Sequence, residues 1–435
     1  MTQPTSLRVT LSPSAAPAAA VAVRMARSLV IGRLEGIEVG ELTVVDEWGT
    51  RVFGRPNTGP SATVHIRDPA AWTAIALGGS LGAGESYMDG LWQADDLVAT
   101  VRMMLRASTR LSSVDGAGFG LVRGTLDSLY HRFRRNTKAG SRRNVAQHYD
   151  LGNEFYRLWL DPSMMYSAAI WEHDEMTLEE AQQARLERIG RKLQLSPNDH
   201  LLEIGTGWGA MALHAASRFG CRVTTTTISE QQHELAQERV REAGLTDRIT
   251  VLLEDYRDLK GTYDKLVSIE MIEAVGAEYL ETFFTKVGSL LGSEGLGVIQ
   301  AITIPDDRFA ESVGRVDFIK RHIFPGGQLA SLDAMSTAWR KQTDLRLLHF
   351  EDFGEHYART LNEWRCRFHA QLPEVEALGY PERFQRMWDF YLASCEGAFL
   401  ERHCGVAQLL LARPDARRAP IVASLSGPRG MLANS

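Results

Sequence analysis

Short apolar runs and amphipathic segments alternate along the chain from Asn144 to about residue 305. Runs rich in aliphatic and β-branched side chains predict five strands, at 200–204, 222–227, 249–253, 265–269 and 297–300. Apolar side chains at helical spacing predict four helices, at 178–194, 208–219, 230–243 and 278–291. Strands that alternate with helices in this way are typical of an α/β fold with a doubly wound, mostly parallel sheet. Beyond residue 305 the pattern predicts mainly helices, rich in aromatic residues.

The first 107 residues have a different texture. Residues 1–25 are rich in Ala, Ser and Pro and predict a loose tail. Between 34 and 66, short alternating runs separated by Gly and Pro predict a small antiparallel sheet. Residues 69–107 have a helical pattern with a Gly-rich break at 78–86. We therefore expect a small α+β domain over 26–107.

A basic segment follows and predicts a linker over 108–143. Between Leu121 and Arg143 there are seven basic residues and one acidic residue, Asp127. Apolar side chains recur at helical spacing among them (Leu126, Leu129, Tyr130, Phe133). The segment is either a solvated connecting helix or a basic amphipathic helix on an anionic membrane surface.

Composition excludes several classes of protein. The chain has 435 residues, 44% hydrophobic and 23% charged, which is typical of a globular protein and excludes disorder throughout. The net charge of -6 gives no overall basic field, so a nucleic-acid partner is not expected. The four cysteines lack metal-ligand spacing, so we predict a reduced setting and no metal site. No apolar run approaches a membrane span, and we expect a cytoplasmic protein.

The sharpest local motif is Leu201-Leu-Glu-Ile-Gly-Thr-Gly-Trp-Gly209, which joins a predicted strand to a predicted helix. Gly205 and Gly207 permit a tight turn and a close approach of the backbone to a ligand. The G-x-G-x-G spacing fits neither a dinucleotide loop nor a phosphate loop. An adenosine cofactor without phosphate, S-adenosylmethionine, fits better.

Polar residues at the next two strand ends are candidates for the same site. Thr227 and Gln232 flank Ser229, which is a natural N-cap of the following helix. Asp255 and Tyr256 close the third strand and are candidates to bind and cover the adenine ring. An aspartate at a strand end is also a common helix cap; the series of three strand ends favours the ligand interpretation.

With these motifs the chain resembles the cyclopropane-fatty-acid synthases and mycolic-acid methyltransferases over about residues 141–411. The matching stretches, in the same order as in that family, are RNVAQHYDLG (143–152), Tyr166-Ser167 with Trp171, LLEIGTGWGA, TISEQQ, EDYRDL, MIEAVG (271–276), IFPGG (323–327), RFQRMW (383–388) and CEGAF (395–399). The resemblance implies a class I methyltransferase domain over 144–435, with helical insertions covering an acyl site. It also implies that the N-terminal domain docks on lipid.

The resemblance implies methyl transfer from S-adenosylmethionine to the cis double bond of an unsaturated phospholipid acyl chain. An isolated alkene is a weak nucleophile, so the methyl donor must be aligned and desolvated. The resulting cation needs aromatic faces and exclusion of water, and a base must remove a proton. The cofactor-binding residues implied by the matched motifs are Tyr166, Ser167, Glu203, Gly205, Gly207, Gly209, Thr227, Gln232, Asp255, Tyr256 and Arg257.

Members of this family hold a bicarbonate ion as the base. Carried over from the family, Glu273 and Tyr357 are ligands of that ion and Cys395 is a further active-site residue. Without the resemblance, Cys395 would be interpreted as an inert buried thiol.

Four positions depart from the family pattern. Ala168 stands in place of the ligand Cys, Gln300 in place of the ligand His, Glu270 in place of Gly, and Ala274 in place of the His after Glu273. These departures put the binding of bicarbonate in doubt. We hypothesise that Glu270 replaces bicarbonate as the proton acceptor, with a pKa raised by burial beside Glu273. The alternative is that Glu270 points to solvent and bicarbonate still binds.

A shifted base favours a methylene product, which a partner reductase would convert to a mid-chain methyl branch. The alternative product is a cyclopropane. An alternative function, from a different class of protein, is that of a catalytically inactive homologue that binds lipid. We expect a homodimer at the inner face of an anionic membrane, where two lipid-binding surfaces raise avidity.

Overall fold

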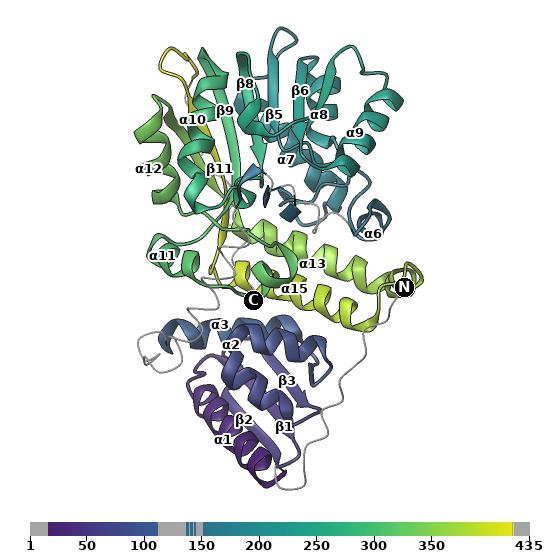
Figure 1. Cartoon of the computed structure of the whole chain (residues 1–435), viewed down its shortest axis with the longest axis vertical. Coiled ribbons are helices and arrows are strands. Elements are labelled where there is room, and N and C mark those ends of the chain that lie inside the picture. Colours follow the sequence, from purple (N-terminus) through teal and green to yellow (C-terminus); the bar gives the residue numbers. More distant parts are fainter. Residues whose placement is uncertain are drawn as a thin grey trace. The chain divides into compact units, whose positions relative to one another are not determined.

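The computed structural model describes residues 16–111, 136–138, 140–141, 143–144, 151–419 and 421. The chain forms two compact units, an N-terminal unit (1–114) and a C-terminal unit (115–435), which are described separately (Figure 1). The amphipathic pattern from Leu126 to Phe133 lies outside the described residues.

The N-terminal unit is built on a four-stranded mixed sheet in the order β2-β1-β3-β4. Its strands are β1 (Gly40–Asp46), β2 (Gly49–Arg55), β3 (Ser61–Ile66) and β4 (Trp92–Ala94). The prediction of an antiparallel sheet is wrong for one pair, because β3 runs parallel to β1. The five residues 56–60 carry the chain from β2 around the start of β1, where Glu41 N donates to Pro60 O. This crossing turn makes the two strands parallel.

The predicted tail over residues 1–25 is also partly wrong, because α1 begins at residue 16. The helices of this unit are α1 (Ala16–Leu34), α2 (Ala70–Met88) and α3 (Leu97–Leu111). Alanines favour the helix, and Pro17 stands in the first turn, where a missing N–H costs nothing. Arg27 on α1 forms an ion pair with Asp46 at the end of β1. Within the predicted Gly-rich break, Gly79 interrupts α2 with a left-handed φ of 56°.

The C-terminal unit contains a seven-stranded sheet in the order β10-β11-β9-β8-β5-β6-β7. The strands are β5 (His200–Ile204), β6 (Arg222–Thr227), β7 (Ile249–Leu253), β8 (Tyr263–Ile269), β9 (Leu291–Thr303), β10 (Arg346–Asp352) and β11 (Gly405–Ala412). The five strands β5 to β9 are parallel and confirm the predicted doubly wound sheet. β11 runs antiparallel between β9 and β10. The sequence pattern missed β10 and β11, since it predicted mainly helices beyond residue 305.

Helices cover both faces of this sheet (Figure 1). The described helices of this unit are α6 (Asn153–Arg157), α7 (Leu178–Leu193), α8 (Ala210–His214), α9 (Glu230–Glu242), α10 (Leu280–Leu290), α11 (Asp306–Gly314), α12 (Leu332–Gln342), α13 (Gly354–Ala370), α14 (Leu372–Ala377) and α15 (Glu382–Leu400). Alternate residues of a strand enter different cores: Leu409 and Leu411 pack in the core of α10 and α12, whereas Leu410 packs in that of α7 and α8. The parity of a residue on β9 or β11 therefore decides which helices it meets.

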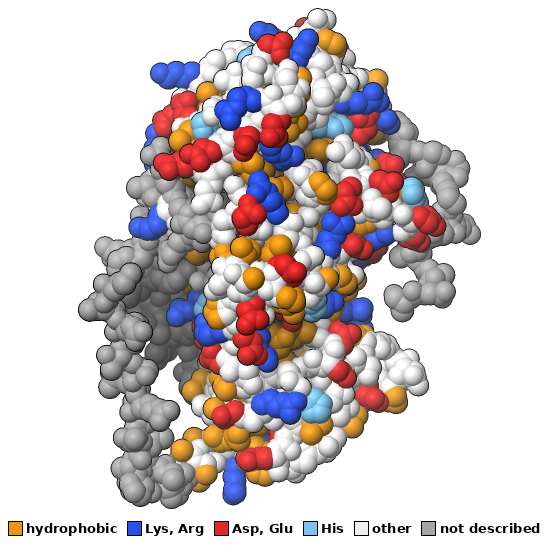
Figure 2. All heavy atoms as spheres, turned by 90° about the vertical axis from the view of Figure 1, so that its right-hand side faces the viewer, with side chains coloured by type: hydrophobic (Ala, Val, Ile, Leu, Met, Phe, Trp, Pro, Cys, Tyr) orange, Lys and Arg blue, Asp and Glu red, His pale blue; other side chains and the backbone are white. Residues whose placement is uncertain are grey.

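Among the described residues, no helix is long and apolar enough to cross a membrane. On the face shown in Figure 2, acidic and basic side chains are interspersed and form no field of one sign.

Candidate functional site

A cavity opens at the carboxyl ends of the parallel strands, where the strand order reverses at β5. It brings together ten of the eleven predicted cofactor residues: Tyr166, Ser167, Glu203, Gly205, Gly207, Thr227, Gln232, Asp255, Tyr256 and Arg257. Gly209 is not in its wall. Asn136, Ser141 and Glu270 also line the cavity.

The glycine loop after β5 needs its glycines for backbone reasons. Gly205 and Gly207 have φ of 101° and 52°, in the left-handed region that favours glycine. A Cβ on Gly205 would lie 3.1 Å from Met271 Cγ. Gly209 also has a positive φ and is the N-cap of α8, so its role is to start this helix. The loop leaves backbone exposed to a ligand, as the sequence motif predicts.

Glu203, at the end of β5, is 2% exposed and accepts a 2.7 Å hydrogen bond from Thr225 Oγ1. Burial raises the pKa of Glu203 to about 8, against the lowering effects of Thr225 and Arg185. A cationic ligand in the cavity would favour the charged carboxylate. The cavity therefore suits a cofactor that carries a sulfonium and an ammonium group.

The end of β6 is organised for hydrogen bonding. Thr227 Oγ1 donates to Gln232 Oε1 over 2.8 Å, so the amide NH2 of Gln232 is left to other acceptors. Ser229 accepts from Gln232 N and caps α9, as predicted.

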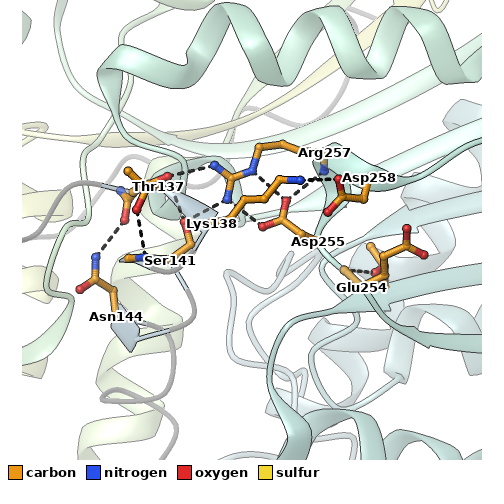
Figure 3. Close-up of polar contacts among 11 residues, drawn as sticks. Thr137, Lys138, Ser141, Asn144, Glu254, Asp255, Arg257 and Asp258 are labelled. Atoms are coloured by element: carbon orange, nitrogen blue, oxygen red, sulfur yellow. Dashed lines mark hydrogen bonds and ion pairs between the residues drawn. The ribbon is translucent and has the colours of Figure 1, made fainter.

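Asp255 takes part in an ion pair that the sequence did not predict (Figure 3). Its carboxylate accepts from Arg257 Nε at 2.8 Å and Nη2 at 2.7 Å, and from Arg257 N at 3.0 Å. Burial alone would raise the pKa of Asp255; the bonds from Arg257 outweigh it and lower the pKa. The structure therefore shows the cap interpretation of Asp255, and its contact with adenine stays a prediction. Tyr256, in the same wall, packs edge-on against Phe283.

Arg257 also fixes the segment before residue 144 to the cavity. Its Nη1 donates to Asn136 O over 3.0 Å, and its Nη2 lies 3.4 Å from Ser141 Oγ. Asn136 Nδ2 in turn donates to Gly326 O. Asn136 and Ser141 thus belong to the site, and the predicted linker boundary at residue 143 is too late. The basic composition of this segment concealed these two polar residues.

Aromatic side chains pack around Tyr166, which lines the cavity. Tyr166 and Tyr391 place their hydroxyl oxygens 2.6 Å apart. The ring of Tyr166 lies 5.3 Å from that of Trp364 and 6.2 Å from that of Phe324. The ring of Tyr166 can therefore offer a π face to a cation formed in the cavity, with the other rings packed around it.

Glu270, at the end of β8, points inward. Its Oε1 accepts from Ala168 N at 2.9 Å and from Gln300 Nε2 at 2.7 Å, and its Oε2 accepts from Tyr357 Oη at 2.8 Å. Its φ of 48° is left-handed, which costs a non-glycine residue about 1 kcal/mol or more. Burial raises its pKa, while the three donors and the charge of Arg185 oppose that rise.

Glu273 accepts fewer hydrogen bonds than Glu270 does. Its Oε1 accepts from Ile302 N over 2.5 Å, and its buried Oε2 has no hydrogen-bond partner among the described residues. Burial, with the charge of Glu270, raises its pKa to about 8. Because Glu270 has three donors and Glu273 has one, the hydrogen bonds favour the charged form on Glu270 over the charged form on Glu273.

Three predicted catalytic residues surround this pair to different extents. Gln300 and Tyr357 bond Glu270 directly. Cys395, on α15, makes no hydrogen bond to Glu270 or Glu273 in the part of the chain that the structure describes, and burial raises the pKa of its thiol well above the usual range. It is therefore a protonated thiol, and a catalytic part for it stays a prediction.

Sequence reasoning missed two buried cations near Glu270. Arg185, on α7, is fully buried and bonds Gln182 Oε1 over 2.9 Å, while its Nε and Nη1 have no partner among the described residues. Lys192 is also buried and lies in the last turn of α7. Both are on the apolar side of a helix, which is the signal that could have identified them. Within the described residues, no group of acidic, His or Cys side chains is placed to hold a metal ion.

The chain is similar in sequence and in fold to known proteins. The family model of mycolic acid cyclopropane synthetase matches residues 136–409. Tuberculostearic acid methyltransferase UfaA1 of Mycobacterium tuberculosis is 33% identical over 418 residues, 94% of this chain and 95% of that protein. Cyclopropane-fatty-acyl-phospholipid synthase of Escherichia coli K12 is 36% identical over 369 residues, 82% of this chain and 89% of that protein. The crystal structure of mycolic acid cyclopropane synthase CmaA1 with SAH and CTAB covers 62% of this chain and 98% of that one, with 31% identity and a TM-score of 0.59.

Proposed function

Because the chain belongs to the mycolic acid cyclopropane synthetase family, we propose that it methylates the cis double bond of an unsaturated phospholipid acyl chain, with Glu270 as the proton acceptor. The membership confirms the resemblance, the class I methyltransferase fold and S-adenosylmethionine as the cofactor. The observation that carries the proposal is the carboxylate of Glu270, held by three donors at the wall of the cofactor cavity.

The reaction asks two things of the protein after the methyl group has moved. The bound cofactor supplies an electrophilic sulfonium methyl; the alkene π pair forms the new carbon–carbon bond, and the electrons of the broken sulfur–carbon bond stay on sulfur. The acyl-chain carbon next to the methylated carbon is then cationic, and water must be excluded from it. The ring of Tyr166 supplies a π face, and Phe324 and Trp364 pack against it and help to exclude water.

The methylated acyl chain must finally lose one proton, which goes to Glu270. A desolvated carboxylate whose charged form is held by three hydrogen-bond donors is a competent base. Glu273 holds its own proton and therefore does not compete for this one. Tyr357, with a pKa raised well above its ordinary value by burial, remains a neutral donor that orients Glu270.

The position of the base decides the product. Proton loss from the methyl group as the ring closes gives a cyclopropane. A hydride shift to the cationic carbon, followed by proton loss from the methyl group, gives a methylene branch. We favour the methylene product, because Glu270 is a side chain anchored on β8 where the family holds a diffusible ion. A partner reductase would then add two electrons and two protons to give the methyl branch.

The test is an incubation of the protein with methyl-labelled S-adenosylmethionine and vesicles of a cis-monounsaturated phospholipid. We expect vinylidene protons in the NMR spectrum of the released acyl chains. Upfield cyclopropane ring protons would contradict the methylene product, but they would still support methyl transfer to the double bond. Absence of labelled lipid would contradict the whole proposal and favour an inactive lipid-binding homologue.

We further propose that α1 rests on an anionic membrane surface. Val21, Met25 and Leu29 are 56%, 68% and 49% exposed and recur every four residues, so they share one helix face. The helix from Ala16 to Leu34 contains no acidic residue and three arginines. An exposed apolar face with basic neighbours is typical of an interfacial helix. A homodimer would double this surface and raise avidity.

Replacing Met25 with Asp should weaken binding to phosphatidylglycerol vesicles about tenfold or more, since it removes one large apolar contact and adds a negative charge. Flotation of the full chain with the vesicles measures this. Val52→Asp is the matched control. Val52 is 59% exposed on β2, and it faces away from the side of the strand where Phe53 is buried. Equal binding by the Met25 variant and the wild type would contradict the surface.

A further inference from the structure

A row of buried polar side chains extends from Glu270 through the sheet to helix α7. Gln300 on β9 and Gln408 on β11 are directly opposite each other in the antiparallel ladder, and both are fully buried. Each has the parity of residues in the core of α7 and α8, so the two amides lie on the α7 side of the sheet. Two amides among aliphatic residues cost free energy unless all their hydrogen bonds are made.

The hydrogen bonds of this row all run in one direction. Lys192 Nζ donates to Gln408 Oε1 over 2.7 Å, Gln408 Nε2 donates to Gln300 Oε1 over 2.9 Å, and Gln300 Nε2 donates to Glu270 Oε1 over 2.7 Å. An ammonium group can only donate, so the oxygen of Gln408 must face Lys192. Its NH2 then faces Gln300, whose oxygen is thereby occupied. The NH2 of Gln300 is consequently left for Glu270.

The far end of the row is itself anchored. Lys192 Nζ also donates to Glu351 Oε2 over 2.6 Å, and Arg188 bonds the same carboxylate. Burial alone would raise the pKa of Glu351, but the bonds from Arg188 and Lys192 lower it to about 2. Glu351 is therefore charged over the working range of pH and holds the lysine in place. Burial lowers the pKa of Lys192, and the bond to Glu351 opposes that effect.

We propose that Lys192 and Gln408 are positioning residues for the reaction, which fix the amide of Gln300 as a donor and so keep Glu270 oriented and ionised. This inference rests on the proposed function. Without the lysine, both amides can turn over together, and the oxygen of Gln300 would then face the carboxylate. Glu270 also faces Tyr357 of α13, the backbone of Ala168, the charge of Arg185 and the neighbouring Glu273, none of which the row changes.

The test is the pH profile of methyl transfer by the full chain, using the labelled cofactor and unsaturated phospholipid vesicles. A base must be deprotonated to act, so the rate rises with pH through the pKa of the Glu270–Glu273 pair. In Lys192→Met and Gln408→Met we expect this rising limb to move to higher pH. On the rising limb the rate should fall about tenfold, and it should recover at high pH, since one pKa unit is a tenfold change in ionisation. The KM for the cofactor should stay within about twofold, because neither Lys192 nor Gln408 lines the cofactor cavity.

The variant Gln408→Glu tests whether the direction of the hydrogen bonds matters, because it changes that direction and keeps the size of the side chain. A carboxylate at 408 accepts from Lys192 and from Gln300 alike, so Gln300 must turn its oxygen toward Glu270. This variant keeps the size of the side chain, yet we expect a larger alkaline shift than in Gln408→Met. Lys320→Met is the matched control: Lys320 is another buried lysine that bonds a glutamine, Gln328, whose own amide donates to Ser312 and not to a carboxylate.

Each outcome has one meaning. An alkaline shift in the three variants and none in the control supports the positioning role. A loss of rate that is equal at every pH, or a profile like that of the wild type, overturns it. If the wild type transfers no methyl group, the proposed function fails, independently of the row.

Discussion

Glu270→Gln is expected to lower the rate of methyl transfer about 1,000-fold, within the range of loss for a general base. Glutamine has nearly the same size, and its oxygen can still accept from Gln300 or Tyr357. The variant should therefore fold and bind S-adenosylmethionine as the wild type does. It lacks only a basic oxygen at the point where the proton must go.

Single-turnover rates with labelled cofactor measure this loss, and calorimetric titration with the cofactor verifies that the cavity is intact. Tyr357→Phe is the matched control, because it removes one of the three donors to Glu270 and keeps the base. We expect about a tenfold loss in that variant, the value of one hydrogen bond to a charged group. Comparable rates in Glu270→Gln and the wild type would show that another group takes the proton.

The second large effect concerns Glu270→Gly, which should be inactive and yet regain activity with added bicarbonate. Position 270 has a φ of 48°, so glycine relieves backbone strain and the variant should fold at least as well as the wild type. Removing the side chain leaves Ala168 N, Gln300 and Tyr357 without their common acceptor. A small planar anion matches these donors.

Adding Ala168→Cys and Gln300→His restores the anion ligands that the resemblance assigns to the family. We expect the triple variant to show a bicarbonate-dependent rate at least about 100-fold above its rate without bicarbonate, the lower range for a recovered base. Product analysis by NMR follows from the same samples. A triple variant that binds cofactor and stays inactive at every bicarbonate concentration would contradict the equivalence of Glu270 and the ion.

The sequence predicted the parallel half of the sheet well, because each of those strands is a separate apolar run followed by its own helix. It missed β11, although Val406 to Ala412 is an apolar run, because helical patterns surround it. The polar residue Gln408 inside that run was the available signal. Its contact with Gln300 depends on strand pairing between residues 108 positions apart, which local periodicity does not encode.

The sequence predicted the site residues that belong to local motifs. It did not predict the contacts that form between segments far apart in the sequence. The glycine loop and the strand-end residues follow from local patterns, and Glu270 stood out as a departure from the family. The left-handed backbone at 270 explains why the family has glycine there. Arg257 was expected beside the cofactor, but its bonds to Asp255 and Asn136 join distant segments that only the folded chain brings together.

The central claim is that this chain carries its own base. The most direct measurement is the methyl-transfer rate of the wild type in buffer freed of carbon dioxide, with and without added bicarbonate, beside the triple variant. We expect the wild-type rate to change less than about twofold, whereas the rate of the triple variant should depend strongly on bicarbonate. A wild-type rate that collapses on depletion and returns with bicarbonate would contradict it.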